Sequence, residues 1–165
     1  SNPKMFKYEW IWQKDKGGNF ANCKYQPMKI HENIVVFGLG KIKYNPIMEE
    51  RPKENIRNNK PRINKSNITG TEWYKEKSLG DRPIKYPTSV KFYNCVRSNF
   101  LHPTQKPVAL FEYLIKTYTN EGDLVLDNCA GSGTTGVACK NLNRNYILIE
   151  KEPEYIDIIN KRLLN

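Results

Sequence analysis

Long apolar runs are missing from the 165-residue sequence, in which the apolar fraction is 38% and the mean hydropathy is −0.73. No window approaches the roughly 18 consecutive apolar residues of a membrane-spanning helix, so we expect no membrane association. No apolar stretch follows a basic N-terminus, which argues against a secretory signal peptide. The sequence therefore predicts a cytoplasmic protein with long polar loops.

Paired cysteine motifs are missing too. The four cysteines form no CxxC pair and show no spacing typical of a metal site: Cys23, Cys95, Cys129 and Cys139. Reduced thiols in a cytosol are the simplest interpretation. We expect neither a disulfide framework nor a bound metal.

Acidic residues are scarce in the first hundred positions. The chain carries 27 Lys and Arg against 17 Asp and Glu, a net charge of +10, and residues 1–100 hold 20 of the basic and 9 of the acidic side chains. A one-sided excess of positive charge is typical of a surface that binds a polyanion. The alternative is a Lys-rich surface that serves only solubility.

Two strands are predicted in residues 1–40. Phe6–Trp12 alternates apolar with polar residues for most of its length, and Ile34–Phe37 is a continuous β-branched and aromatic run. Residues 41–100 keep no helical or strand period, and Arg51–Asn67 is especially basic. We expect a long irregular insert there, because loops of that length usually have a function or are disordered.

Residues 101–165 show a regular pattern of alternating elements. A helical stripe begins after Pro107, a short strand covers Leu124–Leu126, and a helix covers Thr134 to about Leu142. A second strand, Tyr146–Glu150, and a helix from Pro153 complete the pattern. Alternating strands and helices with short links predict a right-handed βαβ unit with a parallel sheet.

A glycine-rich turn, Asp127–Gly133, connects the first of these strands to its helix. Glycines there let a ligand lie against the backbone, and the helix offers free N–H groups at its start. Glu150 ends the next strand, where an acid can accept hydrogen bonds from both hydroxyls of a ribose. The turn therefore predicts a nucleoside-containing ligand, and its GxG pattern disfavours a dinucleotide. A tight strand–helix turn with an incidental acid is the alternative.

A second polar turn precedes this unit, in His102–Val108. Two prolines stiffen its backbone, and Lys106 offers a cation to a carboxylate. A rigid entry to the following helix is the alternative interpretation.

These three motifs, in their order and spacing, resemble the C-terminal part of site-specific DNA amino-methyltransferases of the β class. Within that class, the chain resembles phage-type members of the adenine-modifying branch. The resemblance implies a partial Rossmann-like α/β fold, the cofactor S-adenosylmethionine and double-stranded DNA as a partner. It also implies that residues 1–40 are late sheet strands, that 41–100 are the target-recognition region, and that 101–165 bind the cofactor.

By the same resemblance, seven residues would hold the cofactor: Thr104, Gln105, Lys106, Asp127, Gly131, Gly133 and Glu150. Asp127 and the two glycines would line its methionine part, residues 104–106 would lie near its carboxylate, and Glu150 would hold the ribose. Asn128 and Cys129 stand where the family more commonly has Pro-Phe.

The catalytic motif of this family, a polar residue followed by Pro-Pro and an aromatic residue, is missing, because no Pro-Pro dipeptide occurs. The nearest strings begin at Asn2 and Asn45, and no catalytic residue is assigned. We therefore expect methyl transfer only if another chain or further sequence completes the site. The alternative is a non-catalytic binder derived from such an enzyme, for example a phage inhibitor of a host defence protein.

The resemblance also implies that two strands between the two halves of the sheet are absent. Their absence would leave strand edges unpaired. We expect a rearranged sheet, a second copy of the chain or another protein to cover them.

Overall fold

The computed structural model describes residues 2–56, 64–65, 72–73, 83–98 and 100–164. The chain divides into two compact units, residues 1–45 with 88–165 and residues 46–87. The larger unit contains helices and both antiparallel and parallel strand pairs, which confirms the predicted α/β fold class.

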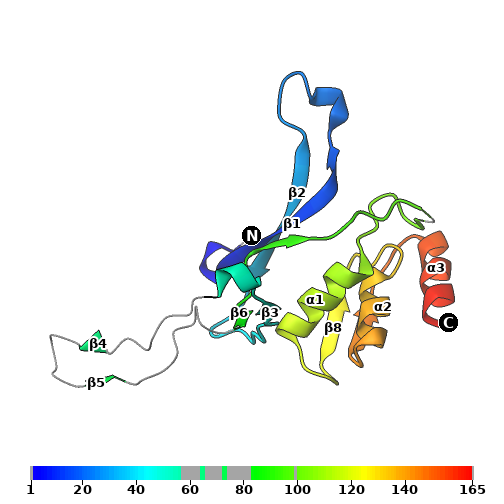
Figure 1. Ribbon diagram of the computed structural model, residues 1–165. Helices are drawn as coiled ribbons and strands as arrows, with labels where there is room; N and C mark the ends of the chain where they lie inside the picture. Colours follow the sequence, from blue (N-terminus) through cyan, green and yellow to red (C-terminus); the bar gives the residue numbers. More distant parts are fainter. Residues whose placement is uncertain (1, 57–63, 66–71, 74–82, 99, 165) are drawn as a thin grey trace. The chain divides into compact units, whose positions relative to one another are not determined.

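A three-stranded sheet forms the first part of the larger unit (Figure 1). β1 (Phe6–Gly18) follows the short 3₁₀ turn η1 (Pro3–Met5) and pairs antiparallel with β2 (Lys29–Phe37). β7 (Val90–Phe92) pairs parallel with β1. β1 is longer than predicted, since the backbone pairing includes Gly18 opposite Lys29. The loop between β1 and β2 contains the 3₁₀ turn η2 (Phe20–Asn22).

A buried tryptophan, Trp10, joins this sheet to helix α1 (Val108–Tyr118). Trp10 and Trp12 lie on one face of β1, and each is only 4% exposed. Nε1 of Trp10 donates to the hydroxyl of Tyr118 at 2.6 Å, and that hydroxyl donates to Tyr8 at 3.1 Å. This network fixes the predicted amphipathic helix against the sheet.

The second part of the unit has the βαβα order predicted from the sequence. β8 (Leu124–Asp127) and β9 (Asn145–Leu148) pair in parallel on either side of α2 (Thr134–Asn141), and α3 (Pro153–Leu164) follows. β9 ends two residues earlier than predicted, so that Glu150 follows the strand rather than ending it. Ile115, Ala138 and Cys139 form the buried core between α1 and α2.

One face of the β8–β9 pair has no cover among the described residues. Leu124 and Leu126 are 60% and 61% exposed, and Ile147, the register partner of Leu126, is also exposed. Val125 points the other way and packs against the core. In the described part of the chain, β8 and β9 pair only with each other, so each has an unpaired edge.

The smaller unit holds short elements within the region predicted as an insert. β3 (Glu49–Glu50) pairs with β6 (Ile84–Lys85), and β4 (Asn64–Lys65) pairs with β5 (Glu72–Trp73); η3 (Lys53–Asn55) is a 3₁₀ turn. Most of the basic stretch Arg51–Asn67 lies outside the described residues. Its assignment to target recognition stays a prediction. No described helix is long and apolar enough to cross a membrane.

Candidate functional site

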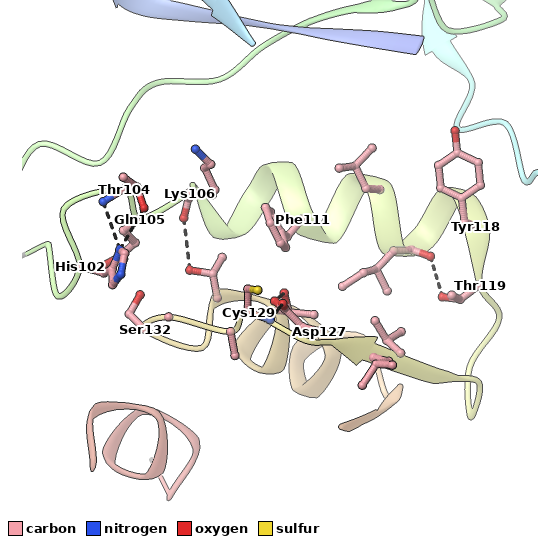
Figure 2. Close-up of a pocket in the computed structure, with 18 residues that line it drawn as sticks. His102, Thr104, Gln105, Lys106, Phe111, Tyr118, Thr119, Asp127, Cys129 and Ser132 are labelled. Carbon is pink, nitrogen blue, oxygen red and sulfur yellow. Dashed lines mark hydrogen bonds between the residues drawn. The ribbon is translucent and has the colours of Figure 1, made fainter. Parts of the chain in front are cut away.

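A cavity of about 510 Å³ lies between α1 and the glycine-rich turn after β8 (Figure 2). Its volume is in the range of small-molecule sites. The cavity brings together five of the seven predicted cofactor residues: Thr104, Gln105, Lys106, Asp127 and Gly131. Gly133 and Glu150 do not line it.

Two glycines shape the turn that forms one wall. Gly131 and Gly133 have φ values of +52° and +77°, a left-handed conformation that strongly favours glycine. The backbone at Gly131 passes under the ring of His102, and a Cβ there would lie 3.5 Å from that ring. A Cβ on Gly133 would lie 2.9 Å from Ile159 of α3, so this glycine permits close packing behind the turn.

Asp127 is held in place where β8 ends. Its carboxylate accepts hydrogen bonds from the Thr135 hydroxyl at 2.5 Å and from the Cys129 N–H at 3.0 Å. These partners belong to the turn and to the first turn of α2. The carboxylate is therefore oriented before any ligand binds, and the turn is closed upon itself.

Glu150 supports the turn from the segment that follows β9. One carboxylate oxygen accepts from the Gly131 N–H at 2.7 Å, and the other accepts from the N–H groups of Lys151 and Glu152. The hydrogen bonds from Glu152 and then Gly131 hold the pKa of Glu150 below its usual value. A carboxylate has about four acceptor positions. Three are used here, which leaves about one for a ligand hydroxyl.

The polar turn before α1 is equally well ordered by hydrogen bonds. Nδ1 of His102 accepts from the Thr104 N–H at 3.2 Å (Figure 2). The Gln105 side chain accepts from the Leu101 N–H at 2.8 Å. The Thr134 hydroxyl donates to the Lys106 carbonyl at 3.4 Å. This bond connects the polar turn to the start of α2, across the cavity.

Lys106 also connects the cavity to the first sheet. Its Nζ lies 2.9 Å from Glu32, and Nζ of Lys14 lies 2.6 Å from the other carboxylate oxygen. Both ammonium groups lie over the ring of Trp12, at 5.6 and 5.3 Å from its centre. Burial acts to raise the pKa of Glu32, but the bonds from Lys14 and Lys106 outweigh it and lower that pKa. The cluster keeps one net positive charge at the cavity.

Arg162 of α3 supports the turn from outside the cavity. Its Nη1 donates to the Ser132 carbonyl at 2.6 Å, and burial lowers the pKa of the guanidinium. Sequence reasoning missed this residue, because it lies 30 positions from its partner. It missed also the apolar wall opposite the turn: Phe111, Leu114, Ile115 and Tyr118. These four belong to the apolar stripe of the helix predicted after Pro107, and only the tertiary structure shows that a cavity adjoins them.

Asn2 and Asn45 begin the two sequence strings that are most like the missing catalytic motif. Neither residue lines the cavity. The Asn2 side chain accepts from the Lys4 N–H and caps η1. The Asn45 side chain donates to the Thr119 carbonyl at 3.1 Å, and its N–H donates to the Thr117 carbonyl at 2.7 Å. Asn45 therefore stabilises the C-terminal end of α1.

Together these features suit a ligand with an anionic or hydroxyl-bearing end and an apolar body. The ammonium group of Lys106 and the hydroxyls of Thr104 and Thr134 lie near one end, and the remaining lining combines the Asp127 carboxylate with aliphatic and aromatic side chains. The left-handed glycine at 131 leaves the backbone open to close contact. The donor set and the shape fit S-adenosylmethionine, which has a carboxylate, hydroxyls and an aromatic base.

Curated relatives share much of this sequence. The chain is 33% identical over 156 residues to the type II methyltransferase M.BglI of Bacillus subtilis, which covers 93% of this chain and 37% of M.BglI. It is 49% identical over 69 residues to the type II methyltransferase M.HpaI of Haemophilus parainfluenzae, which covers 42% of this chain and 22% of M.HpaI. The chain thus spans well under half the length of either relative.

Solved structures share the fold. A crystal structure of the M1.HpyAVI–SAM complex matches 96% of this chain and 62% of its own, with a TM-score of 0.59 and 30% identity. The cytosine-N4-specific PvuII DNA methyltransferase matches 97% of this chain and 52% of its own, with a TM-score of 0.64. At 19% identity it shows the fold alone. A family model described as DNA methylase matches residues 2–161. The chain therefore belongs to the DNA methylase family.

Proposed function

We propose that this chain binds S-adenosylmethionine and double-stranded DNA as the cofactor-binding part of a DNA adenine-N6 methyltransferase. The observation that supports it most is the cavity, where two turns far apart in the sequence bring five predicted cofactor residues together (Figure 2). Adenine as the target rests on the sequence resemblance.

Three of the seven predicted residues then have defined roles toward the cofactor. Lys106, whose Nζ lies 2.9 Å from Glu32 at the cavity, binds the carboxylate of the methionine part. Asp127, oriented by Thr135 and Cys129, accepts a hydrogen bond from its ammonium group. Glu150 accepts one ribose hydroxyl with its remaining position while it keeps the turn closed through Gly131.

The bound cofactor would supply an activated methyl group on a sulfonium, and this chain would orient it. Methyl transfer also needs acceptors for the target amino group and an aromatic surface for the flipped base. The side chains of Asn2 and Asn45, the two candidates, form hydrogen bonds at helix ends instead. We propose that a further polypeptide, continuous with this chain or separate, supplies the catalytic motif.

The exposed apolar face of the β8–β9 pair supports this arrangement. Leu124, Leu126 and Ile147 lie together on it, beside an unpaired strand edge. Apolar groups at such an edge favour association with another polypeptide. That polypeptide is the completing segment or, in its absence, a second copy of this chain.

Calorimetric titration with S-adenosylmethionine tests the proposed function. We expect binding with a micromolar dissociation constant, weakened at least tenfold by Glu150→Ala and by Lys106→Ala. Glu154→Ala, on the exposed start of α3, is the matched control and is expected to bind as the wild type does. No heat of binding at millimolar ligand would overturn the proposal.

The competing function is that of a non-catalytic binder, such as an inhibitor of a host defence protein. The structural use of Asn2 and Asn45 is the observation that favours it. A methyl-transfer assay on unmodified DNA, with the completing polypeptide added, separates the two. Incorporation of label into adenine supports the enzyme, and its absence with intact cofactor binding supports the binder.

A further inference from the structure

The ammonium group of Lys106 is already paired in the ligand-free structure. One carboxylate oxygen of Glu32 lies 2.9 Å from Nζ of Lys106, and the other lies 2.6 Å from Nζ of Lys14. The Lys106 side chain extends away from Asp127 and Cys129, although the residue lines the cavity (Figure 2). A carboxylate ligand in the cavity therefore pairs fully with Lys106 only if this side chain turns away from Glu32.

The cluster allows Lys106 to turn while Glu32 stays in place. Glu32 and Lys14 belong to the paired strands β2 and β1, and Glu32 lies opposite Trp12 in their register. Lys106 belongs to the turn before α1, and its side chain is 35% exposed against 16% for Lys14. A lysine ammonium on its flexible four-carbon stem changes partner easily.

Lys14 removes most of the cost of such a change. A partly buried carboxylate that loses its only cation is destabilised, because its charge is left uncompensated. Glu32 would keep the ammonium of Lys14 at 2.6 Å, over the ring of Trp12, after Lys106 had turned. The second lysine therefore makes the pairing of Lys106 with Glu32 reversible.

We propose that Glu32 is a positioning residue that competes with the carboxylate of the cofactor for the Lys106 ammonium, and that Lys14 keeps Glu32 paired when Lys106 turns to the cofactor. The inference rests on the proposed function, because it presumes that S-adenosylmethionine occupies the cavity. Two carboxylates that need the same cation weaken each other's pairing by the same free energy. Glu32 thus lowers the affinity of the cavity for the cofactor.

This competition has a use in turnover. The demethylated product of S-adenosylmethionine carries the same carboxylate, so Glu32 weakens the binding of cofactor and product alike. Uniformly tight binding of both would not speed the chemical step, and it would slow the release of the product.

Calorimetric titration with two ligands tests the role of Glu32. S-adenosylmethionine and its decarboxylated form differ only in the carboxylate. Glu32→Gln should bind S-adenosylmethionine about two- to fivefold more tightly than the wild type, as expected for a partly exposed ion pair. Its affinity for the decarboxylated form should not change. Glu9→Gln is the matched control, because Glu9 is on the same strand pair but pairs with Asn33 on the other face.

Lys14→Gln should have the opposite effect. Glu32 then has Lys106 as the one remaining cation of the cluster and holds it more firmly, so S-adenosylmethionine should bind about two- to fivefold more weakly. Lys14→Arg keeps the charge and should restore the affinity of the wild type. Lys4→Gln, at an exposed lysine of η1, is the control for the loss of a cation.

A double variant shows whether Glu32 acts through Lys106. Lys106→Ala/Glu32→Gln should bind S-adenosylmethionine no more tightly than Lys106→Ala does, because there is no ammonium to release. The effects of Glu32→Gln and Lys14→Gln should also shrink at about 0.5 M salt, where partly exposed charges are screened. Circular dichroism should show that every variant is folded.

The outcomes separate this inference from the proposed function. If the wild type binds neither ligand, both are overturned. If the wild type binds S-adenosylmethionine but Glu32→Gln binds it equally or more weakly, the inference is wrong and the proposed function stands. A change that is equal for the two ligands would show a purely structural role and overturn the inference. A tightening that persists without Lys106 would show direct repulsion by Glu32 and likewise overturn it.

Discussion

Gly133 meets two constraints at one backbone position: a left-handed conformation and contact with α3. In Gly133→Ala the new Cβ would lie 2.9 Å from Ile159 at a φ of +77°. We expect a loss of about 1–3 kcal/mol in the free energy of unfolding, measured by urea titration, together with weaker cofactor binding.

Gly122→Ala is the matched control for this substitution. Gly122 has a similar φ of +80°, but its added Cβ would meet nothing within 4 Å. Gly122→Ala should therefore lower the free energy of unfolding only by the cost of the left-handed backbone, about 1 kcal/mol, and should keep cofactor binding. Equal losses in the two variants would show that the contact with Ile159 has no energetic effect.

The two ion pairs of Glu32 predict a specific pH dependence of stability. Its pKa in the folded chain is lowered from the ordinary value of 4.5, since Lys14 and Lys106 outweigh the effect of burial. The resulting stabilisation is therefore fully present above pH 4.5 and is lost as pH falls through the lower folded pKa. Glu32→Gln should be less stable than the wild type by about 1 kcal/mol at neutral pH, because half-exposed ion pairs contribute little.

Urea titrations from neutral to acidic pH, followed by tryptophan fluorescence, measure this difference. The gap between the wild type and Glu32→Gln should be constant at neutral pH and should shrink below pH 4.5. Glu154→Gln, at an exposed position on α3, controls for the loss of a carboxylate. A gap that widens in acid would contradict the interpretation.

At the scale of elements, the C-terminal part was predictable and the first sheet less so. Helices and strands after residue 101 follow clear periodic patterns, and their observed bounds differ from the predicted ones by one or two residues, as in β9. β7 was not predictable, because it has three residues and no period. Its place depends on pairing with β1, including the Ile11 N–H bond to the Ser89 carbonyl at 2.8 Å.

The candidate site also has a part that the sequence predicts and a part that it does not. The two turns have local signals, in their prolines, glycines and acids, and the structure brings five of the seven residues together. The contacts between the turns and other elements have no such signal, because the partners are far apart in sequence. Glu32 lies 74 positions from Lys106, and its role follows only from the folded geometry.

The junction between β1 and α1 gives a prediction at this scale. Tyr118→Phe removes both the acceptor for Trp10 and the donor to Tyr8. Burial and the Tyr8 hydroxyl raise the pKa of Tyr118, so its neutral form makes these bonds at physiological pH. We expect a loss of about 1–3 kcal/mol in urea titrations, because the buried indole N–H is left unsatisfied.

Tyr8→Phe is the control for this variant. It removes only the acceptor at the end of the chain of hydrogen bonds and leaves the Trp10 bond intact. Its loss should be smaller, about 0.5–1.5 kcal/mol. A loss as large as that of Tyr118→Phe would show that the Trp10 bond is not the dominant interaction.

At the scale of the whole molecule, the main feature is that β8 and β9 pair only with each other among the residues that the structure describes. Val125 of β8 packs against the core, while Leu124 and Leu126 are 60% and 61% exposed, although Leu126 also lines the cavity. Burying a leucine fully stabilises by about 1.5–3 kcal/mol. A surface of this kind beside an open strand edge therefore favours association with whatever polypeptide can cover it.

This feature predicts that the chain alone self-associates. In sedimentation velocity, the wild type should form larger species as its concentration rises through the micromolar range. Leu124→Ser/Leu126→Ser should shift it towards a monomer, because serine removes most of the apolar area. Leu39→Ser, at an 81% exposed leucine outside this sheet, should leave association unchanged.

Addition of the polypeptide that carries the catalytic motif should replace self-association with a defined complex. This complex should form only when Leu124 and Leu126 are intact. A monomeric wild type at every concentration would refute the prediction.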